Sequence, residues 1–281
     1  MNKVAYLNSR FIKFRNAKIH IEDRGLQFSD SVYEVVPFYL NKFIDFNYHI
    51  ERLKYSLNEL DLKFHINSNK LKKIFIKLIE KNNIQSGLIY LQITRGIQKR
   101  DHAYKDNYIP NIIIYCMKKK FNLPNKSFEG KTAITTKDLR WKRRDIKSVS
   151  LLANILAKKI AAKKGAYEAI LIENNIVTEG TSSNVWIVKN NILKTHPSNN
   201  NILKGITRDS VKKLVKEEKI KFQEKAFTIN QLFKSDEVFV TSSASFVTPI
   251  VKIDNKIIKN GKIGSITSKL SKIYFAKIKN K

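Results

Sequence analysis

Apolar side chains recur at helical spacing in two stretches of the first third of the chain. Within residues 48–60 they stand at Ile50, Leu53 and Leu57, and residues 69–82 repeat the pattern on a single stripe. Positions at this spacing share one face of a helix. Both stretches therefore predict amphipathic helices that cover a core.

Short apolar runs surround these two helices and predict strands. Pro37 predicts a bend in one of them, because proline has no N–H to give to a sheet. The polar stretch at residues 95–110 predicts a loop. The predicted strands are residues 3–7, 18–21, 31–41, 87–94 and 111–117. This mixture predicts an α+β N-terminal domain at residues 1–118.

A polar stretch that contains Pro124 predicts a linker at residues 119–130. Beyond it, strands and helices alternate, which predicts an α/β domain at residues 131–281. The predicted strands there are residues 132–136, 168–173, 184–189 and 237–241, the helices are 149–164, 207–218 and a last one from Ser265, and a hairpin is predicted at Asp254 and Asn255.

The formal charge of +30 raises nucleic acid as a partner, because Lys and Arg neutralise phosphates. Only ten of the 54 basic residues are Arg, however, and the lysines are spread along the whole chain. This distribution favours a solvated Lys-rich surface and no nucleic-acid partner. A basic nucleic-acid-binding protein stays open as the alternative from a different class.

Composition also bears on location and on chemistry. The single cysteine, Cys116, excludes an internal disulfide and favours a reducing compartment. No run reaches the roughly 18 apolar residues of a membrane span, and residues 1–15 lack a signal-peptide pattern. We expect a cytoplasmic protein with no membrane partner. Metal-ligand spacing, Gly-rich phosphate loops and the Gly-x-Ser-x-Gly turn are absent, so no metal site is predicted.

A set of short motifs follows in order along nearly the whole chain. They are residues 22–25 (EDRG), 32–35 (VYEV), 49–53 (HIERL), 145–148 (DIKS), 177–184 (VTEGTSSN), 203–208 (LKGITR) and 240–243 (VTSS). In this order they resemble the class IV, or fold-type IV, aminotransferases, and among these the enzymes that act on D-amino acids. The resemblance implies pyridoxal 5'-phosphate as cofactor and an α/β fold whose C-terminal domain is a pseudo-barrel that carries the cofactor lysine.

The resemblance assigns the cofactor to residues of these motifs. Lys147 would hold it and shuttle the proton, and the Glu179 carboxylate would keep its ring nitrogen protonated. Arg52 would hold the phosphate, to which its planar fork is suited. The other implied cofactor contacts are Ser182, Ser183, Leu203, Ile206, Thr207 and Ser243.

Each of these residues also has an ordinary explanation. Lys147 is one lysine among many, although Lys142, Arg143 and Arg144 disfavour a further positive charge beside it. Glu179 would suit a turn, and Arg52 a helix surface. Residues 205–207 open a predicted helix, whose free N–H groups suit a phosphate. Thr207 could equally be its N-cap, and the two roles can coexist.

The substrate side is assigned to Arg100, His102 and Tyr33. Arg100 and His102 show the Arg-x-His spacing of D-amino-acid aminotransferases, in the same loop. With Tyr33 they would hold the substrate carboxylate by charged and hydroxyl hydrogen bonds. A solvated polar loop with an incidental Arg and His is the simpler alternative.

The sequence departs from the family pattern at a few positions. Ser29 and Ser31 flank Asp30 where the family usually has glycines, and a serine forced to positive φ would be strained. Thr181 replaces a usual serine and keeps the hydroxyl.

The resemblance implies a ping-pong transamination of D-alanine with 2-oxoglutarate, giving pyruvate and D-glutamate. The partners would be small amino acids and 2-oxo acids, and the enzyme a homodimer. Branched-chain L-amino-acid aminotransferase and aminodeoxychorismate lyase share the lysine and glutamate motifs, so both stay open as alternatives.

Overall fold

The computed structural model describes residues 3–121, 124 and 128–280. The chain packs as two compact units: Met1–Phe121 with Ile146–Ser150, and Asn122–Asp145 with Leu151–Lys281. The predicted linker at 119–130 includes residues 122–123 and 125–127, which lie outside the described residues. The segment of Lys147, expected in the C-terminal domain, packs with the first unit instead.

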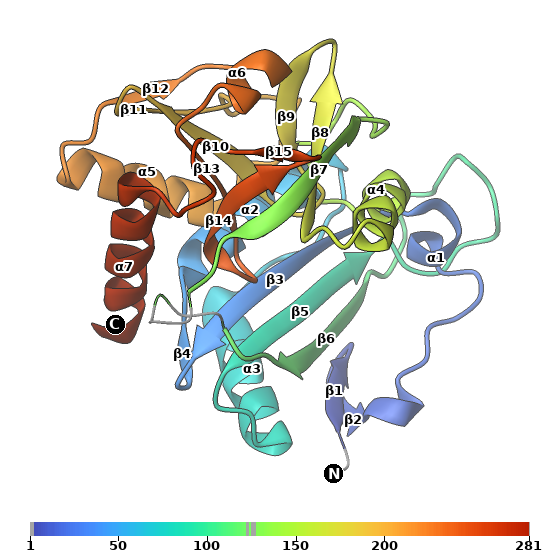
Figure 1. The fold of residues 1–281 in the computed structure, drawn as a ribbon. Helices are drawn as coiled ribbons and strands as arrows, with labels where there is room; N and C mark the ends of the chain where they lie inside the picture. Colours follow the sequence, from blue (N-terminus) through green and yellow to red (C-terminus); the bar gives the residue numbers. More distant parts are fainter. Residues whose placement is uncertain (1–2, 122–123, 125–127, 281) are drawn as a thin grey trace. The chain divides into compact units, whose positions relative to one another are not determined.

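The first unit is built on a six-stranded sheet with the order β2-β1-β6-β5-β3-β4 (Figure 1). All its pairings are antiparallel, and β3 and β5 pair in register from Ser31 with Thr94 to Phe38 with Gly87. The strands are β1 (Val4–Leu7), β2 (Arg10–Lys13), β3 (Ser31–Tyr39), β4 (Lys42–Phe43), β5 (Gly87–Thr94) and β6 (Asn111–Lys118).

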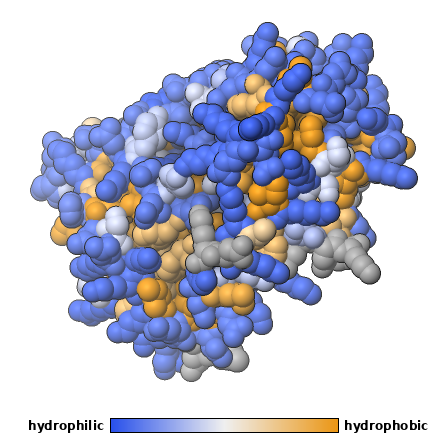
Figure 2. Space-filling view, turned by 90° about the vertical axis from the view of Figure 1, so that its left-hand side faces the viewer, coloured by the Kyte–Doolittle hydropathy of each residue, from blue (hydrophilic) through white to orange (hydrophobic). Residues whose placement is uncertain are grey.

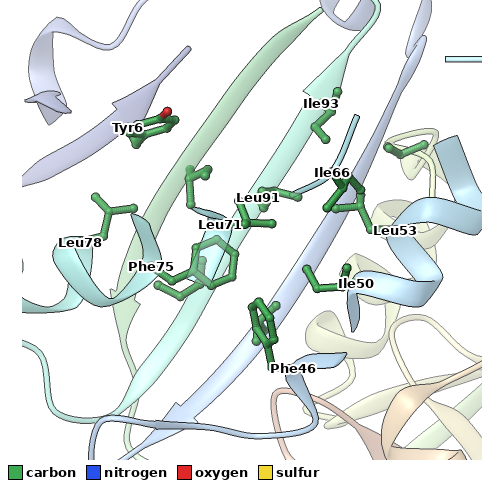
Figure 3. Packing of buried hydrophobic residues seen from close by; sticks show 14 of the residues in the cluster. Tyr6, Phe46, Ile50, Leu53, Ile66, Leu71, Phe75, Leu78, Leu91 and Ile93 are labelled. Carbon is green, nitrogen blue, oxygen red and sulfur yellow. The ribbon is translucent and has the colours of Figure 1, made fainter. Parts of the chain in front are cut away.

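Helices α2 (Phe46–Glu59) and α3 (Ser68–Asn82) place their apolar stripes in the core of this unit. Figure 3 shows Ile50 and Leu53 of α2 and Phe75 of α3 beside Leu91 of the sheet. The short helix α1 (Arg24–Phe28) and the 3-10 turn η1 (Phe14–Asn16) complete the unit. Both predicted amphipathic helices are thus confirmed within a few residues.

Alternation along β3 separates two chemical surfaces. Val32, Glu34 and Val36 are buried on the helix-covered side, whereas Tyr33 and Val35 are half-buried on the other. The strand continues through Pro37 without a break. The Pro37 carbonyl accepts a hydrogen bond from Ile44 N at 2.9 Å, and this bond needs no N–H from the proline. The predicted strand at 18–21 is wrong: residues 17–20 have no regular structure and residue 21 lies in a turn.

The second unit is built on a nine-stranded sheet with the order β12-β11-β10-β13-β14-β7-β8-β9, and β15 pairs with β14 (Figure 1). Its pairings are mixed, since β14 with β7 and β7 with β8 are parallel. The strands are β7 (Lys131–Lys137), β8 (Glu168–Glu173), β9 (Ile176–Gly180), β10 (Asn184–Lys189), β11 (Ile192–Thr195), β12 (Phe222–Glu224), β13 (Glu237–Ser242), β14 (Phe246–Ile253) and β15 (Lys256–Ile257).

The described part of this unit also contains the helices α4 (Leu152–Lys163), α5 (Ile206–Glu217), α6 (Ile229–Phe233) and α7 (Ser265–Asn280). Helix α4 packs Ala157 and Ala161 against β7 and β8. One apolar cluster of this unit joins residues of its strands to Phe227, just before α6, and to Leu232 of α6. The mixed sheet with helices agrees with the α/β class that the sequence predicts.

Figure 2 shows a face on which hydrophilic residues predominate, with apolar residues gathered in several areas between them. Within the described part of the chain, no helix combines the length and the apolar character that crossing a membrane requires.

Candidate active site

The first unit supplies an amine, Lys147, held at the edge of its sheet. The residues around it pair with the start of β3, on the side where β4 pairs with its end: Tyr33 N donates to the Lys147 carbonyl at 3.0 Å, and Val32 pairs with Ser148. The Lys147 Nζ lies 4.2 Å from the centroid of the Tyr33 ring. Backbone pairing with β3 thus fixes the position of the Lys147 backbone, from which the half-buried side chain extends.

Helix α2 contributes a buried ion cluster on the opposite side of β3. Arg52 donates to Glu34 through Nε at 2.7 Å and through Nη2 at 2.9 Å, and His49 Nδ1 lies 2.7 Å from the same carboxylate. Burial raises the pKa of Glu34, but Arg52 and His49 together hold it well below the ordinary value. Burial lowers the pKa of His49. One edge of the Arg52 fork is therefore committed to Glu34.

The 95–110 loop of the first unit carries Arg100 and His102, and both are exposed. Their side chains meet at Phe28 of α1: the Arg100 Cζ lies 4.6 Å from the ring centroid and the His102 ring 5.5 Å from it. Tyr33 lies elsewhere in the same unit, under the Lys147 amine and stacked on Tyr90. Arg100 and His102 thus lie together at Phe28, whereas Tyr33 lies with the lysine and not with this pair.

The second unit supplies a buried carboxylate, Glu179 at the end of β9. It accepts hydrogen bonds from Arg140, from Asn184 Nδ2 at 2.9 Å, and from Leu203 N at 3.1 Å to each oxygen. Arg140 is held in turn by Asp138. Glu179 is therefore more than a turn residue. The Leu203 backbone N–H is bonded to this carboxylate, and a contact of Leu203 with the cofactor stays a prediction.

Burial and counter-charge act in opposite directions on this carboxylate. Removal from water raises the pKa of Glu179, and Arg140 opposes that shift. Arg140 itself loses solvation, but Glu179 and Asp138 raise its pKa above the ordinary value, so it stays a cation. Sequence reasoning missed Arg140, whose one signal is its place two residues after Asp138 at the end of a strand.

A second buried carboxylate, Glu168, organises the loop that follows Glu179. It accepts from the Thr181 hydroxyl at 2.5 Å and from the Ser183 hydroxyl at 2.8 Å. Thr181 thus uses the hydroxyl that it shares with the usual serine. The Ser183 hydroxyl is committed to Glu168, whereas Ser182 is exposed.

Helix α5 begins without a side-chain cap. Gly205 is its N-cap residue, so the alternative that Thr207 is the N-cap is wrong; Ile206 and Thr207 form the first turn and are buried. A Cβ on Gly205 would lie 1.9 Å from Asn184 Oδ1. The glycine therefore lets the helix start approach the residue that holds Glu179. Ser243 lies half-buried in the turn between β13 and β14.

The departures in the 29–31 segment have structural consequences. Ser29 has φ 57°, in the left-handed region, so one of the two positions does require a conformation that suits glycine. Ser31 is fully buried, and its hydroxyl donates to the Ile93 carbonyl at 3.0 Å and accepts from Gln92 at 2.9 Å. Ser29 is therefore held in a strained backbone conformation, whereas Ser31 is stabilised by the hydrogen bonds of its hydroxyl.

The three cations that precede Lys147 are each paired with a carboxylate. Lys142 and Arg144 pair with Glu173, and Arg143 pairs with Asp145. Their positive charges are compensated by these carboxylates.

Comparisons with known proteins give one family. Residues 31–253 match the family model of amino-transferase class IV. D-alanine aminotransferase of Staphylococcus aureus (strain MSSA476) is 40% identical over 272 residues, which cover 96% of this chain and 95% of that protein. D-alanine aminotransferase of Listeria monocytogenes serotype 1/2a (strain 10403S) is 41% identical over 97% of this chain and 95% of its own length.

Solved structures share the fold. A branched-chain amino acid aminotransferase of T.th., solved with pyridoxamine 5'-phosphate, has a TM-score of 0.91 at 23% identity and covers all of this chain and 95% of its own. The Escherichia coli branched-chain amino acid aminotransferase has a TM-score of 0.89 at 24% identity, and the match covers 98% of this chain and 94% of that chain. The chain belongs to the class IV aminotransferases, enzymes that use pyridoxal phosphate.

Proposed function

We propose that this aminotransferase acts on D-amino acids, with D-alanine and 2-oxoglutarate as its substrates and pyruvate and D-glutamate as its products. The observation that carries the proposal is the exposed Arg100 and His102 pair on the 95–110 loop, both against Phe28. The curated relatives at 40% and 41% identity, named D-alanine aminotransferases, support the same substrate class.

The residues present fit the cofactor of the class. The uncapped start of α5, at Ile206 and Thr207, offers backbone N–H groups to a phosphate, and Arg52, which also pairs with Glu34, adds a positive charge. Ser182, Ser183 and Ser243 complete the proposed set. When bound, pyridoxal phosphate supplies an aldehyde that condenses with amines and a ring that accepts electron density.

Lys147 and Glu179 divide the proton chemistry in this proposal. Lys147 would bind the cofactor, and its amine, once displaced, would take up the α-proton of the substrate and give it back. The Glu179 carboxylate holds a proton on the ring nitrogen. Arg140, Asn184 and the Leu203 N–H keep that carboxylate oriented. Arg100, His102 and Tyr33 hold the substrate carboxylate and so select the D-isomer.

We propose a homodimer as the working form. Exposed apolar residues form a helical stripe on α4, where Leu152 is 71% and Ile155 59% exposed, followed by Leu156 and Ile160. A stripe of this kind suits a second copy of the chain. Replacing Leu152 and Ile155 by Lys should halve the mass that light scattering measures. A cytoplasmic location stays a prediction from the single cysteine.

The test is a panel of D- and L-amino acids with 2-oxoglutarate, followed by borohydride reduction and peptide mass spectrometry. We expect turnover of D-alanine and D-glutamate and a reduced cofactor on Lys147. Lys147→Arg should abolish both, whereas Lys164→Arg, at the end of α4, should change neither.

The alternatives give different results in the same panel. Preference for L-leucine or L-valine would identify a branched-chain aminotransferase. Release of pyruvate from aminodeoxychorismate would identify a lyase. A nucleic-acid-binding protein would show no bound chromophore, and its affinity for nucleic acid would fall steeply with salt and survive the loss of Lys147.

A further inference from the structure

We infer that Arg24 and Phe28, at the two ends of α1, are positioning residues that set the geometry of Arg100 and His102 for the substrate carboxylate. The inference rests on the proposed function. It adds two residues that touch neither substrate nor cofactor in that proposal and that act through the 95–110 loop.

Arg24 fixes the backbone of the loop. Its side chain is buried, and its Nη1 donates to the Asp101 carbonyl at 2.6 Å and its Nη2 to the His102 carbonyl at 3.2 Å. Its Nε donates to Asp30 at 2.9 Å. A planar guanidinium with three directed bonds defines an orientation, so these two carbonyls are set relative to Asp30.

Phe28 fixes the side chains of the pair. The Cζ atoms of Arg24 and Arg100 each lie 4.6 Å from its ring centroid, and the His102 ring lies 5.5 Å away. Gln27 adds an acceptor 3.4 Å from Arg100 Nη1. Arg100 and His102 are exposed and would otherwise sample many rotamers, so the ring contact lowers the entropy lost when they bind a carboxylate.

Helix α1 is itself tied to the sheet, which gives the two residues a rigid base. Its N-cap Asp23 is fully buried and accepts from Gly25 N, from Thr94 Oγ1 at 2.8 Å and from Asn111 Nδ2 at 2.6 Å. Asp30, just beyond the helix, also accepts from Arg95 at 2.7 Å. Helix α1 thus links the loop that carries Arg100 and His102 to strands β5 and β6.

The experiment compares holoenzyme variants by two readouts, KM for D-alanine and the inhibition constant of propanoate. Propanoate is a carboxylate without an amino group, so it reports carboxylate binding alone. Phe28→Leu should raise both constants about tenfold, because a small displacement of a gripping group has a large cost. Phe28→Tyr keeps the ring and should stay close to the parent protein.

Arg24→Lys separates charge from orientation, since it keeps a cation for Asp30 but cannot donate along three fixed directions. It should raise the two constants as Phe28→Leu does, while kcat and the visible absorbance of the bound cofactor stay near the parent values. Unchanged constants in both Phe28→Leu and Arg24→Lys would overturn the inference, as would equal losses in Phe28→Leu and Phe28→Tyr.

Arg100→Ala distinguishes the two levels of the proposal. If it does not weaken propanoate, the carboxylate role of the loop fails, and the inference fails with it. If Arg100→Ala weakens the binding of propanoate but Phe28→Leu and Arg24→Lys do not, the proposed function stands and only the positioning role is lost.

Discussion

The backbone N–H of Lys147 donates to the hydroxyl of Ser56 at 3.1 Å. Ser56 is fully buried on α2, one helical turn beyond Arg52. The same helix therefore carries the proposed phosphate ligand and the group that fixes the backbone of the proposed cofactor lysine. Tyr33 N fixes the other side of that residue, through its carbonyl.

Ser56→Ala should reduce turnover more than stability. The change leaves a partly buried N–H without its partner, which costs about 1 kcal/mol of unfolding free energy. Because the lysine backbone is then held only through its carbonyl, we expect kcat to fall about tenfold or more. Urea unfolding and D-alanine turnover measure the two effects.

Ser235→Ala is the matched control, since Ser235 is also buried and its hydroxyl donates to the Leu232 carbonyl in the second unit. It should lose comparable stability and keep kcat. Equal losses of kcat in the two variants would contradict a specific role for Ser56.

Arg140→Gln should be strongly destabilising. It removes the cation that opposes burial of Glu179, and breaking one side of a buried ion pair costs about 3–5 kcal/mol. Cofactor retention should weaken with it, because without Arg140 the pKa of Glu179 is raised further and its negative charge is disfavoured. Unfolding by urea and the absorbance of dialysed protein measure both.

Arg143→Gln provides the comparison for Arg140→Gln. Arg143 also pairs with a carboxylate, Asp145, but its side chain is 37% exposed. Such a pair contributes about 1 kcal/mol or less. If the two variants unfold at the same urea concentration, the burial argument for Arg140 is wrong.

Gly205→Ala tests the close approach at the start of α5. The added methyl would meet Asn184 Oδ1, and overpacking of this kind costs about 1–3 kcal/mol. Because Asn184 also bonds Glu179, we expect weaker cofactor binding as well as lower stability, measured by thermal unfolding and by titration with pyridoxal phosphate. The neighbouring Lys204→Ala, at an exposed position, should leave the affinity unchanged.

The elements with a strong pattern were predictable. The stripes of α2 and α3 and the strands β5 and β6 follow from local periodicity, because burial on one face leaves that trace in the sequence. Short strands such as β11 and β12 were missed, and residues 18–21 are not a strand although their pattern suggests one. In such segments pairing partners far along the chain decide the structure.

The candidate site divides in the same way. Lys147, Glu179 and the Arg100 and His102 pair are marked by ordered motifs. Arg140 and Ser56 are not marked by a motif, because their roles arise from contacts with residues far along the chain. Arg140 contacts Glu179, 39 positions away, and Ser56 contacts Lys147, 91 positions away. Local pattern carries no record of such partners, so only the fold identifies them.

The Glu34, Arg52 and His49 cluster predicts a loss of stability in mild acid. The pKa of His49 is lowered from 6.5 by burial, so the folded protein keeps it neutral at a pH where the unfolded chain already takes up a proton. Its contribution is complete above pH 6.5 and is lost as the pH falls toward the folded value. The pKa of Glu34 is lowered from 4.5, so its contribution is lost in the same direction but only below pH 4.5.

His49→Asn separates the two contributions, because the amide N–H can replace Nδ1 as a donor to Glu34 without titrating. We expect the parent protein to lose unfolding free energy between pH 7 and pH 5.5, and His49→Asn to show a flatter dependence in that window, as measured by urea unfolding. His65→Asn, at an exposed position, should follow the parent curve. Parallel curves for the parent and His49→Asn would show that the buried histidine is not what makes the fold sensitive to mild acid.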